Sequence, residues 1–193
     1  MITDNEILLT LMKRTASGDE AAFEQLVSAF ESAVYNLAYS SLRQRQDAED
    51  VTQEVFLRLW RNRSSFRGEC AVKTYIMHIA HNAVTDSLRR RNSHAVTALP
   101  DDTDDEDAPR RELADSTDLQ AEYIRKERQA AVHQAISELD PNSRELIIMR
   151  DINGLSYAEI ADATDIPLGT VKSRLSRARD QLKEFLKKGN FFN

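Results

Sequence analysis

The chain has 193 residues and a mass of 22.0 kDa, a length that suits one compact domain or two small ones. Only 5 glycines and 4 prolines interrupt it, which favours long helices over many short strands. Its single cysteine excludes an intramolecular disulfide framework and an all-thiolate metal site, and the formal net charge of −6 argues at first against a nucleic-acid partner. No apolar run approaches the roughly 18 residues that cross a bilayer, and the start MITDNEILLTLMKR lacks the regions of a signal peptide. We therefore expect a cytoplasmic protein without membrane insertion.

Residues 1–91 predict a succession of amphipathic helices. Asp19 is expected to cap a helix over 22–42 whose apolar side chains recur at spacings of three and four. A polar break precedes the helix DAEDVTQEVFLRLW, and a loop over 64–69 separates that helix from another over 71–91. The last of these helices ends in three basic residues, Arg89, Arg90 and Arg91.

The helix DAEDVTQEVFLRLW has one apolar and one polar side. Its apolar side chains share a face: Val51, Val55, Phe56 and Leu59. Polar side chains lie on or near the opposite face: Asp47, Asp50, Gln53, Glu54 and Arg58. From periodicity alone, the simplest interpretation of the polar face is exposure to solvent.

The stretch 92–118 is strongly acidic. It holds nine acidic residues and two bases, a net charge of −7, so the rest of the chain carries +1. With two prolines and almost no large apolar side chains, it cannot bury enough surface to offset the entropy lost on ordering. We predict a flexible acidic linker here, between an N-terminal domain over 1–91 and a C-terminal domain over 119–193. A second role for the linker, in shielding a basic surface, stays open.

The C-terminal part has the layout of a helix-turn-helix. A helix is expected over 122–139, after which Ser143 is the predicted cap of a helix that ends before Gly154. Ser156 and Glu159 have capping-box spacing for a short second helix, and the turn TDIP precedes a long final helix. The whole sequence therefore predicts an all-α fold of two small helical domains joined by the linker.

The final helix carries concentrated positive charge, because residues 166–188 include seven bases and two acids, a net of +5. Projected at about 100° per residue, the side chains opposite its apolar stripe are Lys172, Ser173, Ser176 and Arg177. Lysine and arginine bond the acceptor edge of guanine, and serine bonds either base of a pair, so these residues predict a recognition helix in the major groove. Arg174 and Arg179 project to the flanks, where phosphate contact is expected. The plainer alternative is a solvated basic helix.

Taken together, the two ends of the chain resemble the extracytoplasmic-function (ECF, group 4) sigma factors, the small subunits that direct bacterial RNA polymerase to promoters. The first signature is DAEDVTQEVFLRLW followed by SFRGECAVKTYIMHIAHNAVTDSLRRR, and the second is LSYAEIADATDIPLGTVKSRLSRAR. The resemblance covers nearly the whole chain except the acidic linker. Both blocks in this order, with a flexible linker between them, are highly specific for the family.

The resemblance implies a role for each block. In the family the first helix docks on the clamp helices of the largest polymerase subunit, and the matching positions are Asp50, Gln53 and Glu54. The following loop and helix capture the −10 promoter element through a base flipped out of the non-template strand, and the matching or supporting positions are Phe66, Arg67, Lys73, Tyr75, Asn82, Arg89 and Arg90. The final helix resembles the −35 recognition helix, with the base-facing and flanking positions Lys172, Ser173, Arg174, Ser176, Arg177 and Arg179.

The same resemblance implies the partners of the chain: RNA polymerase core, promoter DNA and a dedicated anti-sigma factor. No cofactor and no enzymatic activity are expected, since the sequence holds no Gly-rich phosphate loop, nucleophile elbow or complete metal-ligand cluster. Two other functions stay open. One is a stand-alone helix-turn-helix regulator that binds duplex DNA through 141–188, and the other is a helical adaptor or anti-regulator that does not bind DNA.

Four positions depart from the family pattern. Tyr75 stands where the family often has Trp, and is most simply a conservative substitute. His78 and His81, three residues apart on one helix with Cys70 nearby, invite a metal-site interpretation, but two imidazoles and a distant thiol are an incomplete ligand set. A redox-sensing role for Cys70 would lack a resolving cysteine. These departures bear on −10 sequence preference rather than on the class of protein.

Overall fold

The computed structural model describes residues 5–95 and 130–188, and in both ranges the regular structure is helical. The bounds are α1 (Asn5–Ala16), α2 (Glu20–Leu42), α3 (Arg45–Arg61), the short 3-10 turn η1 (Arg63–Ser65), α4 (Val72–Ala95), a helical segment over 130–137, α6 (Pro141–Ile147), the π-helical turn η2 (Ile148–Ile152), α7 (Tyr157–Thr164) and α8 (Leu168–Lys188). The predicted all-α architecture is therefore confirmed. None of the helices in the described ranges is long and apolar enough to span a membrane.

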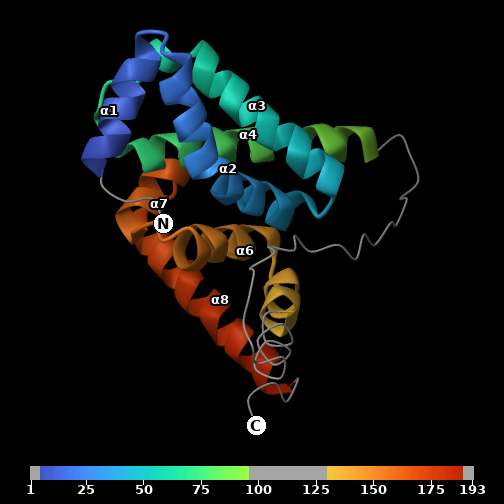
Figure 1. Cartoon of the computed structure of the whole chain (residues 1–193). Helices are drawn as coiled ribbons and strands as arrows, with labels where there is room; N and C mark the ends of the chain where they lie inside the picture. Colours follow the sequence, from blue (N-terminus) through green and yellow to red (C-terminus); the bar gives the residue numbers. More distant parts are fainter. Residues whose placement is uncertain (1–4, 96–129, 189–193) are drawn as a thin grey trace, which may run out of the picture.

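The long helix α4 lies between α3 and α7 (Figure 1). On one side it packs against α2 and α3, and on the other against α7, which also contacts α8. The helix α2 reaches across to α6 and η2. The N-terminal half, 5–95, and the C-terminal half, 130–188, are thus packed against each other, an arrangement that the sequence did not predict.

Local sequence signals account for the ends of the N-terminal helices. The Asp19 carboxylate accepts a hydrogen bond of 3.0 Å from the amide of Ala22 and so caps α2, as expected. This hydrogen bond, together with the one from Arg14, lowers the pKa of the Asp19 carboxyl group. Gly18 before the cap adopts a φ of 93°, a left-handed conformation that glycine takes without steric cost.

The first helix of the helix-turn-helix begins differently from the sequence prediction. Its cap is Asp140, whose carboxylate accepts from the amide of Ser143 at 3.1 Å, so Ser143 itself lies inside α6 and the predicted Ser143 cap is wrong. Proline at position 141 fits the first helical position because its missing N–H needs no partner there. The capping box at Ser156 and Glu159 is confirmed, with bonds of 3.2 and 2.7 Å.

Asp140→Ala is expected to cost about 1 kcal/mol of unfolding free energy, because it removes the acceptor for an amide at the start of α6. Asn142→Ala is the matched control, since Asn142 is an exposed residue of the same turn. Urea unfolding of both variants measures the difference. An equal loss from both substitutions would contradict the assignment of Asp140 as the cap.

One hydrophobic core runs through both halves of the molecule. Its largest fully buried side chains are Met12, Leu26, Phe30, Leu37, Leu42, Leu59, Ile76, Met77, Leu139, Leu146, Ile147 and Met149. At about 25 cal/mol per Å² of apolar surface removed from water, such burial is the main stabilising contribution of the fold. The continuous core makes the contact between the halves part of the packed interior.

The predicted limits of the two domains and of the linker can be compared with the helices of the described residues. The expected end of the first domain, residue 91, lies inside α4, which continues to Ala95. Apart from 92–95, the acidic linker predicted over 92–118 lies outside the described residues. The helix predicted over 122–139 is described only from residue 130 onward.

Candidate functional site

The polar face of α3 holds the three residues matched to polymerase binding. Asp50 and Gln53 are exposed, one turn apart on the solvent side of the helix. Glu54 is half-buried and accepts a 2.8 Å hydrogen bond from Arg58, which also contacts Asp86 of α4 at 3.0 Å. The bond that Arg58 donates to Glu54 raises the pKa of Arg58, and the bond to Asp86 adds to this effect, while burial partly opposes it. Asp50 and Gln53 are therefore free to meet a partner, while Glu54 is tied to α4 through Arg58.

The loop before α4 brings two predicted −10 residues together. The rings of Phe66 and Tyr75 lie 5.1 Å apart, tilted by 51°, and both side chains are half-buried. Burial raises the pKa of the Tyr75 hydroxyl group. Arg67, next to this aromatic pair, is exposed. The loop thus presents an aromatic pair beside a cation, the combination that stacks and neutralises single-stranded nucleic acid.

Lys73 faces the other half of the molecule. Its ammonium lies near Gly154, 3.7 Å from the position that a Cβ would take there, and close enough to Glu159 for an electrostatic attraction. Burial outweighs this attraction and lowers the pKa of Lys73. The neighbouring Thr74 contacts the Glu159 carboxylate at 3.5 Å. In this arrangement the C-terminal half partly covers Lys73.

Asn82 belongs to a chain of hydrogen bonds that crosses between the halves. Its side-chain amide nitrogen lies 3.0 Å from Nε2 of His78, and Nδ1 of His78 lies 3.1 Å from the carbonyl oxygen of Ala163 in α7. A carbonyl accepts only, so Nδ1 of His78 is the donor and Nε2 is free to accept from Asn82. The predicted base reader is exposed, yet one of its amide hydrogens is already engaged.

The basic end of α4 is solvent-facing. Arg89 and Arg90 are exposed, and Arg91 donates a 3.0 Å hydrogen bond to the carbonyl of Leu42, the last residue of α2. This bond satisfies one of the carbonyls left without a helical partner at the end of α2. Arg89 and Arg90 thus lie on the surface, where contact with a phosphate backbone stays a prediction, and Arg91 has a structural role.

The final helix presents its predicted base-facing residues outward. Val171, Leu175 and Ala178 are buried in the core, and four side chains on the other side are exposed: Lys172, Ser173, Ser176 and Arg177. This agrees with the projection made from the sequence. Two cations and two hydroxyls on one helical face match the acceptor-rich and mixed edges of base pairs in a major groove.

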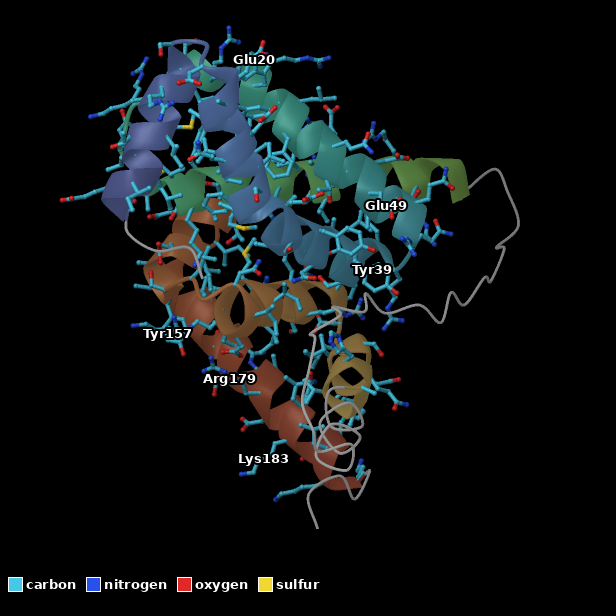
Figure 2. The ribbon with its side chains drawn as sticks, viewed as in Figure 1. Glu20, Tyr39, Glu49, Tyr157, Arg179 and Lys183 are labelled. Atoms are coloured by element: carbon cyan, nitrogen blue, oxygen red, sulfur yellow. The ribbon has the colours of Figure 1, made fainter. Side chains whose placement is uncertain are left out.

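The two flanking arginines of α8 differ. Arg174 is half-buried, whereas Arg179 reaches back to Asp151 with bonds of 2.6 and 3.2 Å and to the Tyr157 hydroxyl at 3.1 Å. These bonds raise the pKa of Arg179. Figure 2 shows Arg179 and Tyr157 close together, and Arg150 stacks on the same tyrosine ring at 4.9 Å. Arg179 ties α8 to η2 and α7, and its contact with a phosphate stays a prediction.

Sequence reasoning missed the residues that join the halves. Arg144 is 6% exposed and donates to carbonyls of the helical region before α6 and to the carbonyl of Ser40 in α2. Glu145 bonds His81 of α4 at 2.6 Å, and Asn153 donates to the carbonyl of Ala33 at 3.1 Å. The partners are 64 to 120 residues apart in the chain. No local pattern could have indicated them.

The residues considered for a metal or redox site have other environments. His78 and His81 bond Ala163 and Glu145, and the described ranges contain no group of three or more side chains suited to hold a metal ion. The half-buried Cys70 has a thiol pKa raised by burial and by the charges of Asp162 and Glu69. A raised pKa disfavours the thiolate, which is the reactive form of cysteine.

Two family models match the chain in the order that the sequence predicts. Sigma-70 region 2 matches residues 26–94, and Sigma-70, region 4 matches residues 129–182. The first match includes α3 and all but the last residue of α4, and the second includes the helix-turn-helix and most of α8. Each candidate surface described above therefore lies within one of the two matched regions.

Relatives and solved structures agree with these matches. The chain is 34% identical to the RNA polymerase sigma-H factor of Pseudomonas aeruginosa over 91% of this chain and 92% of that protein. It is likewise 34% identical to the ECF RNA polymerase sigma-E factor of Escherichia coli K12, over 89% and 90%.

Two solved complexes contain chains of the same overall arrangement. The structure of CnrH in complex with the cytosolic domain of CnrY aligns with a TM-score of 0.67 and 25% identity over 96% of this chain and 99% of that one. The sigma factor RpoE in complex with the anti-sigma factor NepR, from Bartonella quintana, aligns with a TM-score of 0.66 and 27% identity over 86% and 96%. The chain therefore belongs to the extracytoplasmic-function group of the sigma-70 family, the RNA polymerase sigma factors that direct transcription initiation at promoters.

Proposed function

We propose that this sigma factor divides its work between two surfaces, as the predicted domains 1–91 and 119–193 suggest. The N-terminal half binds RNA polymerase core through Asp50, Gln53 and Glu54 and captures the melted −10 strand. The residues that would hold that strand are Phe66, Arg67, Lys73, Tyr75, Asn82, Arg89 and Arg90. The C-terminal half reads the −35 duplex through Lys172, Ser173, Ser176 and Arg177, with Arg174 and Arg179 as flanking phosphate contacts.

The exposed row on α8 is the observation that carries this proposal. Its two cations and two hydroxyls point away from a buried apolar stripe on the same helix. The preceding α7 and the turn at Asp165 hold α8 in the second position of a helix-turn-helix, the position that enters the major groove. No catalytic role is proposed for the chain itself, since its relatives are named as factors, and the bond-forming chemistry would belong to the polymerase.

The proposed partners include an anti-sigma factor. Two solved neighbours of this fold are complexes, one of them explicitly of a sigma factor with an anti-sigma factor. Because this chain aligns with most of the matched chain in each complex, we expect it to bind a comparable regulator. Such a regulator, RNA polymerase core and promoter DNA would meet this protein in the cytoplasm.

Promoter-dependent run-off transcription with core polymerase tests the proposal. The wild-type chain is expected to give discrete products from a genomic library, and the double variant Asp50→Ala, Gln53→Ala is expected to lose core binding by about tenfold or more. The matched control is Glu24→Ala, Gln25→Ala, which removes an exposed acid and an exposed amide from α2.

Run-off transcription together with DNA footprinting in the absence of polymerase separates the alternatives. A stand-alone regulator would protect a palindromic duplex from cleavage without polymerase. A helical adaptor would give neither products nor DNA protection. Either result, with absent core binding, would contradict the proposed function.

A further inference from the structure

Part of the contact between the two halves is built on one face of α4. Side chains spaced three or four residues apart on that helix meet the C-terminal half, through the pairs Thr74 with Glu159, His78 with Ala163, and His81 with Glu145. In Figure 1 α4 meets α7, and α6 lies next to α2. Lys73 and Asn82, both assigned here to the −10 strand, belong to the same part of α4. Contact between the halves and contact with DNA therefore draw on the same stretch of helix.

His81 and Glu145 form the shortest polar contact of this face. The distance from Nδ1 of His81 to Oε1 of Glu145 is 2.6 Å, and the two side chains are only 18% and 13% exposed. A bond this short from a half-buried imidazole to a half-buried carboxylate is charge-assisted. A neutral imidazole with its hydrogen on Nδ1 can also donate it, but the protonated imidazole adds the attraction between opposite charges. If His81 loses its proton, the carboxylate loses its only charged partner in the pair and remains shielded from water.

We propose that His81 and Glu145 act as a proton-operated latch between the halves of the molecule, which holds the chain in the closed arrangement at acidic pH and releases it as the pH rises. The latch itself is independent of the function proposed above. Its consequence, control of access to Lys73 and Asn82 by the −10 strand, rests on that function.

The charges around His81 favour its protonated form in the closed arrangement, as the proposed latch requires. Burial lowers the pKa of His81, but the hydrogen bond and charge of Glu145 from α6 and the charge of Asp165 at the end of α7 outweigh it, so the pKa is raised in the closed state. Closure therefore takes up a proton. Its stabilisation is complete below the pKa of the open state, ordinarily about 6.5, and is lost as the pH rises through the higher pKa of the closed state.

Other charged groups near this face of α4 do not reverse the direction of the pKa shift of His81. From α3, Arg58 pairs with Asp86, which lies five residues further along α4. From α6, Arg144 has a pKa lowered by burial to about 10, well above the range in which an imidazole titrates. The core side chains that α2 contributes are apolar, and on α4 itself His78 is engaged with Ala163 and Asn82.

His78 connects closure to the proposed base reader. Its Nδ1–H donates to Ala163 of the other half, which leaves Nε2 as the acceptor for the Asn82 amide. When the halves separate, His78 loses the carbonyl that selects this tautomer. Opening consequently frees the Asn82 amide to bond a base, and it uncovers Lys73 for the phosphate backbone.

Pulsed electron-electron distance measurements on the full chain test the latch. Nitroxide labels at Glu20→Cys and Lys183→Cys, in a Cys70→Ser background, report the separation of the halves from two exposed positions that Figure 2 marks at opposite ends of the molecule. We expect one closed distance at about pH 6 and a second, broader population at about pH 8.5. The ratio of open to closed should change by about tenfold for each unit by which closure raises the pKa of His81.

Three variants locate the effect. His81→Gln and Glu145→Gln are each expected to abolish the pH dependence of the distance distribution, while His133→Gln, which changes an exposed histidine outside the interface, should keep it. Circular dichroism checks that each variant is folded. If His81→Gln does not fold, the distance distribution of Glu145→Gln alone tests the latch. An unchanged pH dependence in the folded variants, or a single closed distance at both pH values in the wild type, would overturn the latch.

A binding readout separates the latch from the proposed function. Affinity for a fluorescent single-stranded −10 oligonucleotide should rise from pH 6 to pH 8.5 in the wild type and in His133→Gln, and should be flat in His81→Gln. Opening without any DNA binding would contradict the proposed function and leave the latch standing. Transcription activity together with a label-to-label distance that does not change with pH would support the proposed function and contradict the latch.

Discussion

The double variant Lys172→Ala, Arg177→Ala is expected to bind a specific −35 duplex at least about 30-fold more weakly than the wild type. Each good contact of this kind to a base pair contributes about 1–3 kcal/mol of discrimination, and both side chains point outward from α8 with no part in the core. Fluorescence anisotropy with a −35 duplex and with a scrambled duplex of equal length measures the loss. Binding to core polymerase should be retained, because Asp50 and Gln53 lie on α3.

Lys187→Ala, Lys188→Ala is the matched control, since it removes the same charge from exposed positions in the last turn of α8. It should lower affinity for both duplexes by a similar, salt-dependent factor, as expected when only general attraction to phosphate changes. If the control lost as much sequence preference as the test variant, the assignment of base reading to Lys172 and Arg177 would be wrong. Loss of core binding in the test variant would instead contradict the division of work between the halves.

Arg144→Met is expected to cost about 3–5 kcal/mol of unfolding free energy, the largest effect on stability among these predictions. The guanidinium of Arg144 donates to four carbonyl oxygens at 2.6 to 3.1 Å, those of Ile136, Ser137, Leu139 and Ser40. Methionine fills much of the same volume but donates nothing, so all four oxygens lose the guanidinium, although that of Ser137 keeps Arg43 as a donor and that of Ile136 keeps the amide of Leu139. Urea or thermal unfolding, followed by circular dichroism, measures the loss.

Arg43→Ala is the control for Arg144. Arg43 also donates to the carbonyl of Ser137, but its side chain is exposed. The expected cost is therefore well under that of Arg144→Met, because water can replace an exposed donor. Equal costs for the two variants would show that burial of Arg144 contributes little.

Much of the helical content followed from local patterns. Asp19 was predicted as a cap because a short side-chain acceptor before an apolar stripe satisfies amides that lack helical partners, and the structure confirms it. The Ser156 and Glu159 capping box followed from the same physics. At α6 the rule pointed to the wrong residue, since Asp140 and Ser143 both can cap and the position of proline 141 within the first turn leaves that role to Asp140.

The residues of the candidate surfaces also fall into those that the sequence could predict and those that it could not. The outward direction of Lys172, Ser173, Ser176 and Arg177 could be predicted, because a helix with a buried apolar stripe turns its opposite face to solvent. The hydrogen bonds between Arg179 and Asp151 could not be predicted, because 28 residues separate the two and neither residue type has a unique partner. The same is true of Lys73. Its place in the sequence predicts a cation on α4, but it does not predict that the C-terminal half of the molecule partly covers this side chain.

The sequence alone thus determined the class of fold, the helix-turn-helix and the residue types on the surfaces proposed for polymerase and DNA, since these depend on contacts within a few residues of the chain. Only the tertiary structure decided that the two halves close on each other over α2 and α4. That arrangement rests on contacts such as Arg144 with Ser40 and His81 with Glu145, between residues 104 and 64 positions apart. Such pairs are chosen by the packing of the shared core and by the loss of water around them, which no short-range periodicity records.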